Sequence, residues 1–157
     1  MSFSFFFFAS IATIANLLAL ASLPSPAAAQ TAVVDRFVRP QQTTTYVEPN
    51  SKSTIRVLID EHLGGTKDVS IAELTIPPGV DVPDHVHQAT EIFYILSGEL
   101  EQTSEGKVQK LTAGMAALVP ANTTTHHKVT SKKPVRALVI WAPGGEEQRI
   151  VERWQKK

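Results

Sequence analysis

The sequence predicts an all-β domain, a sandwich or barrel of short strands, followed by a short C-terminal helix. From Thr54 onward, short runs rich in β-branched and aromatic residues recur, and turn residues separate them. Residues 146–155 differ, because Ile150, Val151 and Trp154 follow helical spacing there, with acidic residues early and basic residues late. No substantial internal repeat is found, so we expect one domain over residues 54–157.

The length, charge and cysteine content exclude several classes of protein. The chain has 157 residues, a formal net charge of +0 and no cysteine. This length suits one small domain. Balanced charge gives no reason to expect nucleic acid or an anionic membrane surface as a partner. The absence of cysteine excludes disulfides, thiolate zinc sites and cysteine nucleophiles.

The N-terminal segment predicts export. Residues 1–29 carry no charged side chain and contain an apolar run that two prolines end, before the small residues Ala27 and Ala29. We predict a secretory signal peptide cleaved after Ala29, which gives a secreted or periplasmic protein without a membrane contact after cleavage. The alternative is an uncleaved anchor, since the apolar run approaches the roughly 20 residues that a membrane span needs.

A polar segment lies between the predicted signal peptide and the domain. Residues 30–53 are rich in threonine and glutamine, contain Pro40 and Pro49, and include one short strand at residues 43–47. Such an arm can pair with the sheet edge of a neighbouring subunit. The alternative is a disordered leader.

The strands of the domain follow from apolar runs and the turns between them. The expected strands are residues 54–59, 69–76, 91–96, 100–103, 107–111, 115–119, 127–130 and 135–141. Residues 61–68, with a Gly-Gly pair, are expected to form a loop, and residues 104–106 predict a hairpin turn.

Within residues 79–98, three potential metal ligands occur close together in a segment with strand character. His85 and His87 are two residues apart, and Glu91 follows four residues later. Because side chains alternate between the faces of a strand, the two histidines share a face, and Glu91 keeps their parity. Two imidazoles and a carboxylate on one face can bind a divalent first-row metal and leave coordination positions open. The alternative is a chance grouping of surface residues.

The glycines around these ligands carry a family resemblance. The spacing Gly79-x5-His85-x-His87-x3-Glu91-x6-Gly98 resembles the first motif of the cupin superfamily at every defining position. The resemblance covers about residues 69–145. It implies a cupin-type jelly-roll barrel with one divalent metal inside it, and a homodimer, since many single-domain cupins are dimers.

The second cupin motif is only partly matched. Its glycine, its proline and a residue that tolerates a left-handed conformation are present as Gly114, Pro120 and Asn122. The motif's histidine would fall at position 125, which is threonine. His126 lies one residue later and His127 two residues later.

The resemblance therefore implies four metal ligands, namely His85, His87, Glu91 and His126, with His127 as the alternative to His126. The metal would be iron, manganese, nickel, copper or zinc, since nitrogen and oxygen ligands do not discriminate among these ions. Glu91 is also the candidate catalytic residue, because a weakly held carboxylate can leave the metal and act as a base.

Other residues near this cluster have less specific roles. Phe93 and Ile95 share the parity of Glu91 and are expected to line the interior, either around a pocket or as plain core. His62 is expected on the surface. Asp84 is expected to be exposed, with orientation of a ligand imidazole as the alternative.

The predicted function is that of a small-molecule metalloenzyme of dioxygenase type. Two alternatives remain open at this level: a metal-dependent isomerase or lyase, and a cupin that binds a carbohydrate or small acid without turnover. A third alternative is a protein in which the metal only stabilises the barrel. The expected partner is a small-molecule substrate or ligand.

Overall fold

The structure is a computed structural model and describes residues 37–157. The predicted signal peptide, residues 1–29, lies outside this range, so secretion stays a prediction. No helix within residues 37–157 is long and apolar enough to cross a membrane. The homodimer also stays a prediction, since the structure describes one chain.

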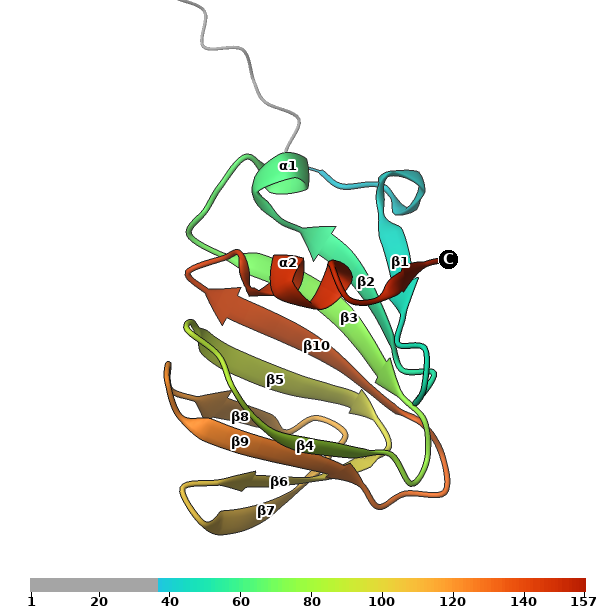
Figure 1. Ribbon diagram of the computed structural model, residues 1–157, viewed down its shortest axis with the longest axis vertical. Helices are drawn as coiled ribbons and strands as arrows, with labels where there is room; N and C mark the ends of the chain where they lie inside the picture. Colours follow the sequence, from blue (N-terminus) through green and yellow to red (C-terminus); the bar gives the residue numbers. More distant parts are fainter. Residues whose placement is uncertain (1–36) are drawn as a thin grey trace, which may run out of the picture. The chain divides into compact units, whose positions relative to one another are not determined.

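The described residues form two antiparallel sheets (Figure 1). The larger sheet holds, in spatial order, β11 (Gln155–Lys156), β1 (Thr44–Val47), β2 (Thr54–Ile59), β3 (Ser70–Ile76), β10 (Val135–Ala142), β5 (Thr90–Ser97) and β8 (Ala116–Val119). The smaller sheet holds β4 (Asp81–Val86), β9 (Thr124–Val129), β6 (Glu99–Ser104) and β7 (Lys107–Thr112). The all-β jelly-roll prediction is confirmed, although strand pairing does not join the two sheets of this region into one closed barrel.

The helices are short. A 3-10 turn (Pro40–Gln42) precedes β1, and α1 (Glu61–Gly64) lies where the sequence predicted a loop. The Asp60 side chain accepts a hydrogen bond from the backbone N–H of Leu63 at 2.7 Å, and Gly65 ends the helix in a left-handed conformation. The predicted C-terminal helix is confirmed as α2 (Glu146–Val151), but it ends earlier than residue 155. The chain then pairs with β1 as β11.

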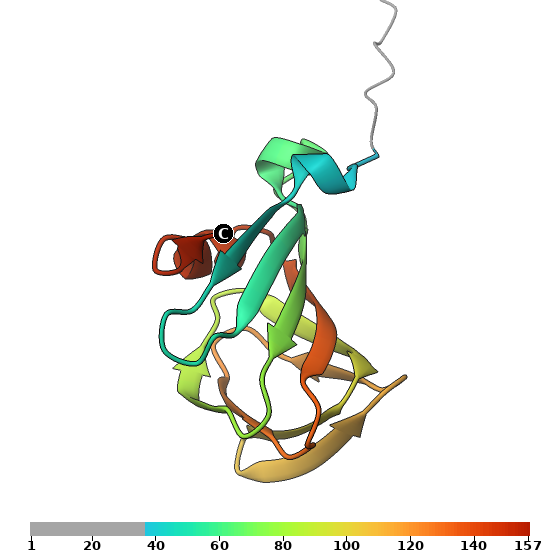
Figure 2. The same ribbon diagram turned by 90° about the vertical axis from the view of Figure 1, so that its right-hand side faces the viewer.

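The strand of the N-terminal arm belongs to its own chain. β1 pairs with β2 on one side, where Thr44 lies opposite Val57, and with β11 on the other, where Tyr46 lies opposite Lys156. Figure 2 shows β1, β2, β3 and β10 side by side in the sheet. Both sides of β1 therefore have a paired strand within the described chain.

Two turns contain a residue with a positive φ, a conformation that glycine and asparagine tolerate well. Gly98, between β5 and β6, has φ of 85°, and an added Cβ would lie 2.7 Å from the carbonyl oxygen of Pro134. Asn122 has φ of 61°, which confirms that it takes the left-handed position expected of it. Its backbone N–H donates to the carbonyl of His87 at 2.8 Å, so this turn is tied to the metal-ligand segment.

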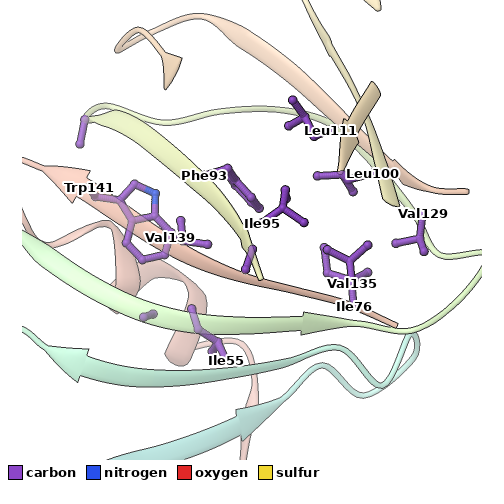
Figure 3. Packing of buried hydrophobic residues seen from close by; sticks show 13 residues of the cluster. Ile55, Ile76, Phe93, Ile95, Leu100, Leu111, Val129, Val135, Val139 and Trp141 are labelled. Carbon is purple, nitrogen blue, oxygen red and sulfur yellow. The ribbon is translucent and has the colours of Figure 1, made fainter. Parts of the chain in front are cut away.

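The hydrophobic core lies between the sheets (Figure 3). The inward-facing residues of β10 and β5 meet in register, with Val139 opposite Phe93 and Trp141 opposite Glu91. Ile95 is fully buried in this cluster, so of its two predicted roles it takes the plain core one. Each large side chain buried in this way contributes about 1.5–3 kcal/mol. The core therefore stabilises the pairing of β10 with β5, the strand that carries Glu91.

An ion-pair network on the outer face of the larger sheet allows a prediction about stability. Glu73 of β3 accepts hydrogen bonds from Arg56 of β2 and Arg136 of β10. The bonds from Arg136, supported by Arg56, hold the pKa of Glu73 below its ordinary value. A group with a lowered pKa stabilises the fold above its ordinary pKa of 4.5, and this contribution is lost as the pH falls through the lowered value.

We therefore expect Glu73→Gln to lower the free energy of unfolding by about 1 kcal/mol at neutral pH. The difference from the wild type should shrink as the pH falls below 4.5. Urea unfolding of the wild type and the variant, at neutral pH and below pH 4.5, measures this difference in unfolding free energy. Glu101→Gln is the control, since Glu101 has no ion pair within residues 37–157. A deficit that does not change with pH would assign the loss to packing.

Candidate metal centre

The structure brings together three of the predicted ligands. His85 lies near the end of β4, His87 directly after it, and Glu91 at the second position of β5. One ligand atom from each of these residues lies within 4.8 Å of the others. His87 Nε2 is 3.3 Å from Glu91 Oε1. The motif therefore predicts the grouping correctly, because its residues are close in sequence and flank one turn.

His127 of β9 borders the same cavity as His85, His87 and Glu91. Its ring centroid lies 5.3 Å from that of His85 and 4.7 Å from that of Phe93. The side chain is buried, and its Nε2 has no hydrogen-bond partner among the described residues. His127 is thus the second-motif histidine that faces the cluster.

His126, the predicted fourth ligand, lies on the opposite face of β9. Its Nε2 is 2.7 Å from Asp81 Oδ1, and its Nδ1 is 3.1 Å from Asp84 Oδ1. The structure does not place His126 with the other three residues, which corrects the sequence prediction. The reason is strand alternation: Thr125, at the motif's strict position, is fully buried, and His127 shares its face while His126 does not. This parity was available in the sequence.

The structure also shows where His62, Asp84 and Phe93 lie. His62 is exposed on α1, as expected. Asp84 is exposed and contacts His126, so it does not orient a ligand imidazole of the cluster. Phe93 borders the cavity above the cluster.

Hydrogen bonds orient the ligand rings. His85 Nδ1–H donates to the carbonyl of Pro83 at 2.8 Å, and His87 Nδ1–H donates to Glu146 Oε2 at 3.1 Å. Each bond leaves Nε2 of the same ring with its lone pair free. The Trp141 indole N–H donates to Glu91 Oε1 at 3.1 Å. Glu91 Oε2 is buried and finds no hydrogen-bond partner in the region that the structure describes.

Burial controls the charges of these groups. It raises the pKa of the Glu91 carboxyl to about 8, opposed by the Trp141 hydrogen bond and assisted by the charge of Glu146. Burial, together with His85 and His87, lowers the pKa of His127 to about 3. Burial also lowers the pKa of His85. The imidazoles of His85 and His127 are therefore neutral at pH 7, which is the form that binds a metal.

The residues fit a divalent transition metal. A buried polar atom without a partner costs free energy, and two such atoms, Glu91 Oε2 and His127 Nε2, belong to this cluster. A cation bound at this cluster would keep Glu91 ionised. Imidazole nitrogens and one carboxylate are ligands that iron, manganese, nickel, copper and zinc accept.

The cluster lies at the side of a cavity of about 600 Å³. Apolar side chains form much of its wall, and they include Ile55, Leu74, Ile76, Phe93 and Trp141. The turn between β1 and β2 contributes Asn50 and Ser51, and the C-terminal helix and the turn after it contribute Glu146, Arg149, Arg153 and Trp154. No pattern in the sequence predicts that the polar residues Asn50, Ser51, Glu146, Arg149 and Arg153 meet at this cavity, because they lie far apart in the chain.

The sequence of this domain is similar to a known family. A family model for the cupin domain matches residues 72–141, the region that carries all four inward-facing residues of the cluster. The chain contains a cupin-superfamily domain. The cupin resemblance of the first motif is thus confirmed.

Solved cupin structures share the fold. An RmlC-like cupin from Shewanella frigidimarina is 18% identical, with a TM-score of 0.60 over 73% of this chain and 96% of that one. KdgF from Halomonas sp. is 16% identical, with a TM-score of 0.60 over 71% of this chain and 96% of that one. A predicted oxalate decarboxylase from Thermotoga maritima is 22% identical, with a TM-score of 0.56 over 68% and 97%. These similarities show the cupin fold alone. No curated protein is significantly similar to this chain in sequence.

Proposed function

We propose that this cupin is a metal-dependent enzyme that acts on a small molecule in the cavity, with dioxygenase-type chemistry. One observation carries the proposal: inward-facing metal-ligand side chains, two with unpartnered buried atoms, border a cavity of about 600 Å³ with a largely apolar wall. A cavity of this size suits one small substrate. A metal that only stabilised the fold would have no need of such a space beside it.

The residues of the chain have distinct parts in this proposal. His85, His87, His127 and Glu91 would hold the ion through three nitrogens and one oxygen. When bound, the ion would supply Lewis acidity toward a substrate oxygen and, if it is redox-active, a means of activating dioxygen. Phe93 and Trp141 exclude water beside the cluster. Glu91 would accept a proton from the substrate if its carboxylate left the ion.

A second candidate is a metal-dependent isomerase or lyase. Glu91 supports it, because its Oε2 is buried beside the cavity without a hydrogen-bond partner in residues 37–157 and is available for proton transfer. This chemistry consumes no oxygen, so one measurement separates the two candidates.

The test begins with the metal content of protein purified without chelator, measured by elemental mass spectrometry. We expect about one transition-metal ion per chain, as a single site of this kind holds. An oxygen electrode then follows uptake with phenolic and diketone substrates, with the chelator-treated protein as the control. Zinc without oxygen uptake would favour the isomerase or lyase. Protein that contains no metal and binds none on addition would overturn the proposal.

A further inference from the structure

We infer that Glu146, at the start of α2, is a positioning residue that holds the His87 imidazole in its metal-binding form. This inference rests on the proposed metal centre but concerns a residue outside both cupin motifs. Glu146 also lies beyond residues 72–141, the part matched by the cupin family model. With this role for Glu146, metal binding would depend on the C-terminal helix α2.

Both oxygens of Glu146 contact the ligand segment. Oε2 accepts a hydrogen bond from His87 Nδ1–H at 3.1 Å, and Oε1 accepts one from the backbone N–H of Gln88 at 2.7 Å. The carboxylate therefore holds the ring of His87 and the backbone just after it at the same time. Glu146 is buried, with 6% of its surface exposed, so these bonds are largely shielded from bulk solvent.

The tautomer of His87 follows from this contact. A carboxylate accepts hydrogen bonds and does not donate them, so Nδ1 carries the proton and Nε2 keeps its lone pair. That Nε2 is the atom 3.3 Å from Glu91 Oε1, on the side where the ion would bind. Loss of Glu146 would free the ring to rotate and to adopt the other tautomer, which cannot bind through Nε2.

The position of Glu146 is itself determined by contacts on two sides. Arg149, one turn later in α2, donates to Oε2 at 3.0 Å and to Oε1 at 3.3 Å. Before the helix, Gly144 donates its N–H to the carbonyl of Lys67 at 2.9 Å. A Cβ at Gly144 would lie 2.8 Å from the carbonyl carbon of Val69, so the chain there lies directly against the start of β3. These contacts direct the first turn of α2 onto the ligand segment.

The helix is also anchored by its apolar side chains. Ile150, Val151 and Trp154 pack against the hydrophobic cluster. Ile150 and Trp154 border the same cavity as the ligands. One short element thus orients a ligand and forms part of the cavity wall, which is why we assign the positioning role to it.

The test compares the zinc affinity of the full mature chain and two variants, Glu146→Ala and Glu146→Gln, by competition with a chromophoric chelator. We expect Glu146→Ala to weaken binding about 10- to 100-fold, as loss of a hydrogen-bond partner of a ligating histidine does. Glu146→Gln, which keeps one acceptor oxygen and the shape of the side chain, should lose less. Glu152→Ala is the matched control, because Glu152 is an exposed glutamate just after the same helix.

A second readout separates positioning from a general effect on folding. In the zinc-loaded wild type, we expect nitrogen-15 NMR to show His87 protonated at Nδ1 with slow exchange. In Glu146→Ala this proton should exchange fast, while the histidine signals of Glu152→Ala stay unchanged. If Glu146→Ala does not fold, Glu146→Gln carries the test through both readouts.

The outcomes distinguish the inference from the proposed function. Wild-type protein that binds no divalent metal would overturn the metal centre itself. Wild-type protein that binds zinc, with the affinity and the His87 signal unchanged in both Glu146 variants, would overturn only the role of Glu146.

Discussion

Replacement of His127 by alanine is expected to abolish stable metal binding, whereas replacement of His126 should leave it intact. His127 is buried against His85 and Phe93 and offers an unpartnered Nε2 within the described region. Loss of the outer partner of a ligating histidine already costs about 10- to 100-fold in affinity, so loss of a ligand should cost more than about 100-fold. Elemental analysis and zinc competition of both variants measure the contrast.

His126→Ala is the matched control, since it removes a neighbouring imidazole from the other face of the same strand. Its contacts with Asp81 and Asp84 are partly exposed, and contacts of this kind contribute less than about 1 kcal/mol to stability. Loss of metal in His126→Ala with retention in His127→Ala would mean that β9 presents its other face in solution. Retention in both variants would leave a three-residue site of His85, His87 and Glu91.

Replacement of Glu91 by glutamine is expected to remove the pH dependence of stability of the metal-free protein between about pH 6.5 and pH 8, as well as the metal site. Burial raises the pKa of Glu91 from 4.5 to about 8 in the folded state. The unfolded chain therefore ionises first as the pH rises. The stability that the protonated Glu91 carboxyl contributes is complete below pH 4.5 and is lost progressively as the pH rises to about 8. Over the whole interval from pH 4.5 to pH 8 the loss amounts to about 5 kcal/mol, at 1.36 kcal/mol per pKa unit, and about 2 kcal/mol of it falls between pH 6.5 and pH 8.

Denaturant unfolding of chelator-treated wild type and Glu91→Gln across this pH range measures the effect. Glutamine keeps an oxygen for the Trp141 N–H but does not ionise, so its unfolding free energy should not fall in the same way. The lowered pKa values of His85 and His127 give the opposite slope below their ordinary value of 6.5 in both proteins, so the difference between the two isolates Glu91. If the unfolding free energies of the two proteins changed with pH in the same way, the pKa of Glu91 would not be raised. The carboxyl would then be hydrated in the folded protein.

The metal-loaded wild type provides a further comparison. A bound cation favours the ionised carboxylate, so the metal-loaded protein should keep its stability as the pH rises toward 8, where the metal-free protein weakens. If added metal does not change the pH profile, Glu91 is not a ligand. That result would separate the role of Glu91 from that of the histidines.

Local features of this chain could be predicted from the sequence because they depend on nearest neighbours. The spacing of His85, His87 and Glu91 predicted their grouping, since three residues across one turn stay close in most arrangements of the strands. The left-handed conformation of Asn122 and the hairpin between β6 and β7 followed from the conformational preferences of the turn residues. Apolar runs located most of the strands within a few residues for the same reason.

Features that depend on contacts between distant segments required the tertiary structure. Strand parity in the sequence already places His126 and His127 on opposite faces, but only the pairing of β9 with β4 and β6 decides which face is turned to the cavity. Glu146 reaches His87 only because α2 packs against the core and Gly144 lies against β3. The arm strand β1 pairs with β2 and β11 because those edges are the nearest partners once the sheet has formed. Strand register and helix docking are decided by packing over the whole domain, and no short stretch of sequence contains that information.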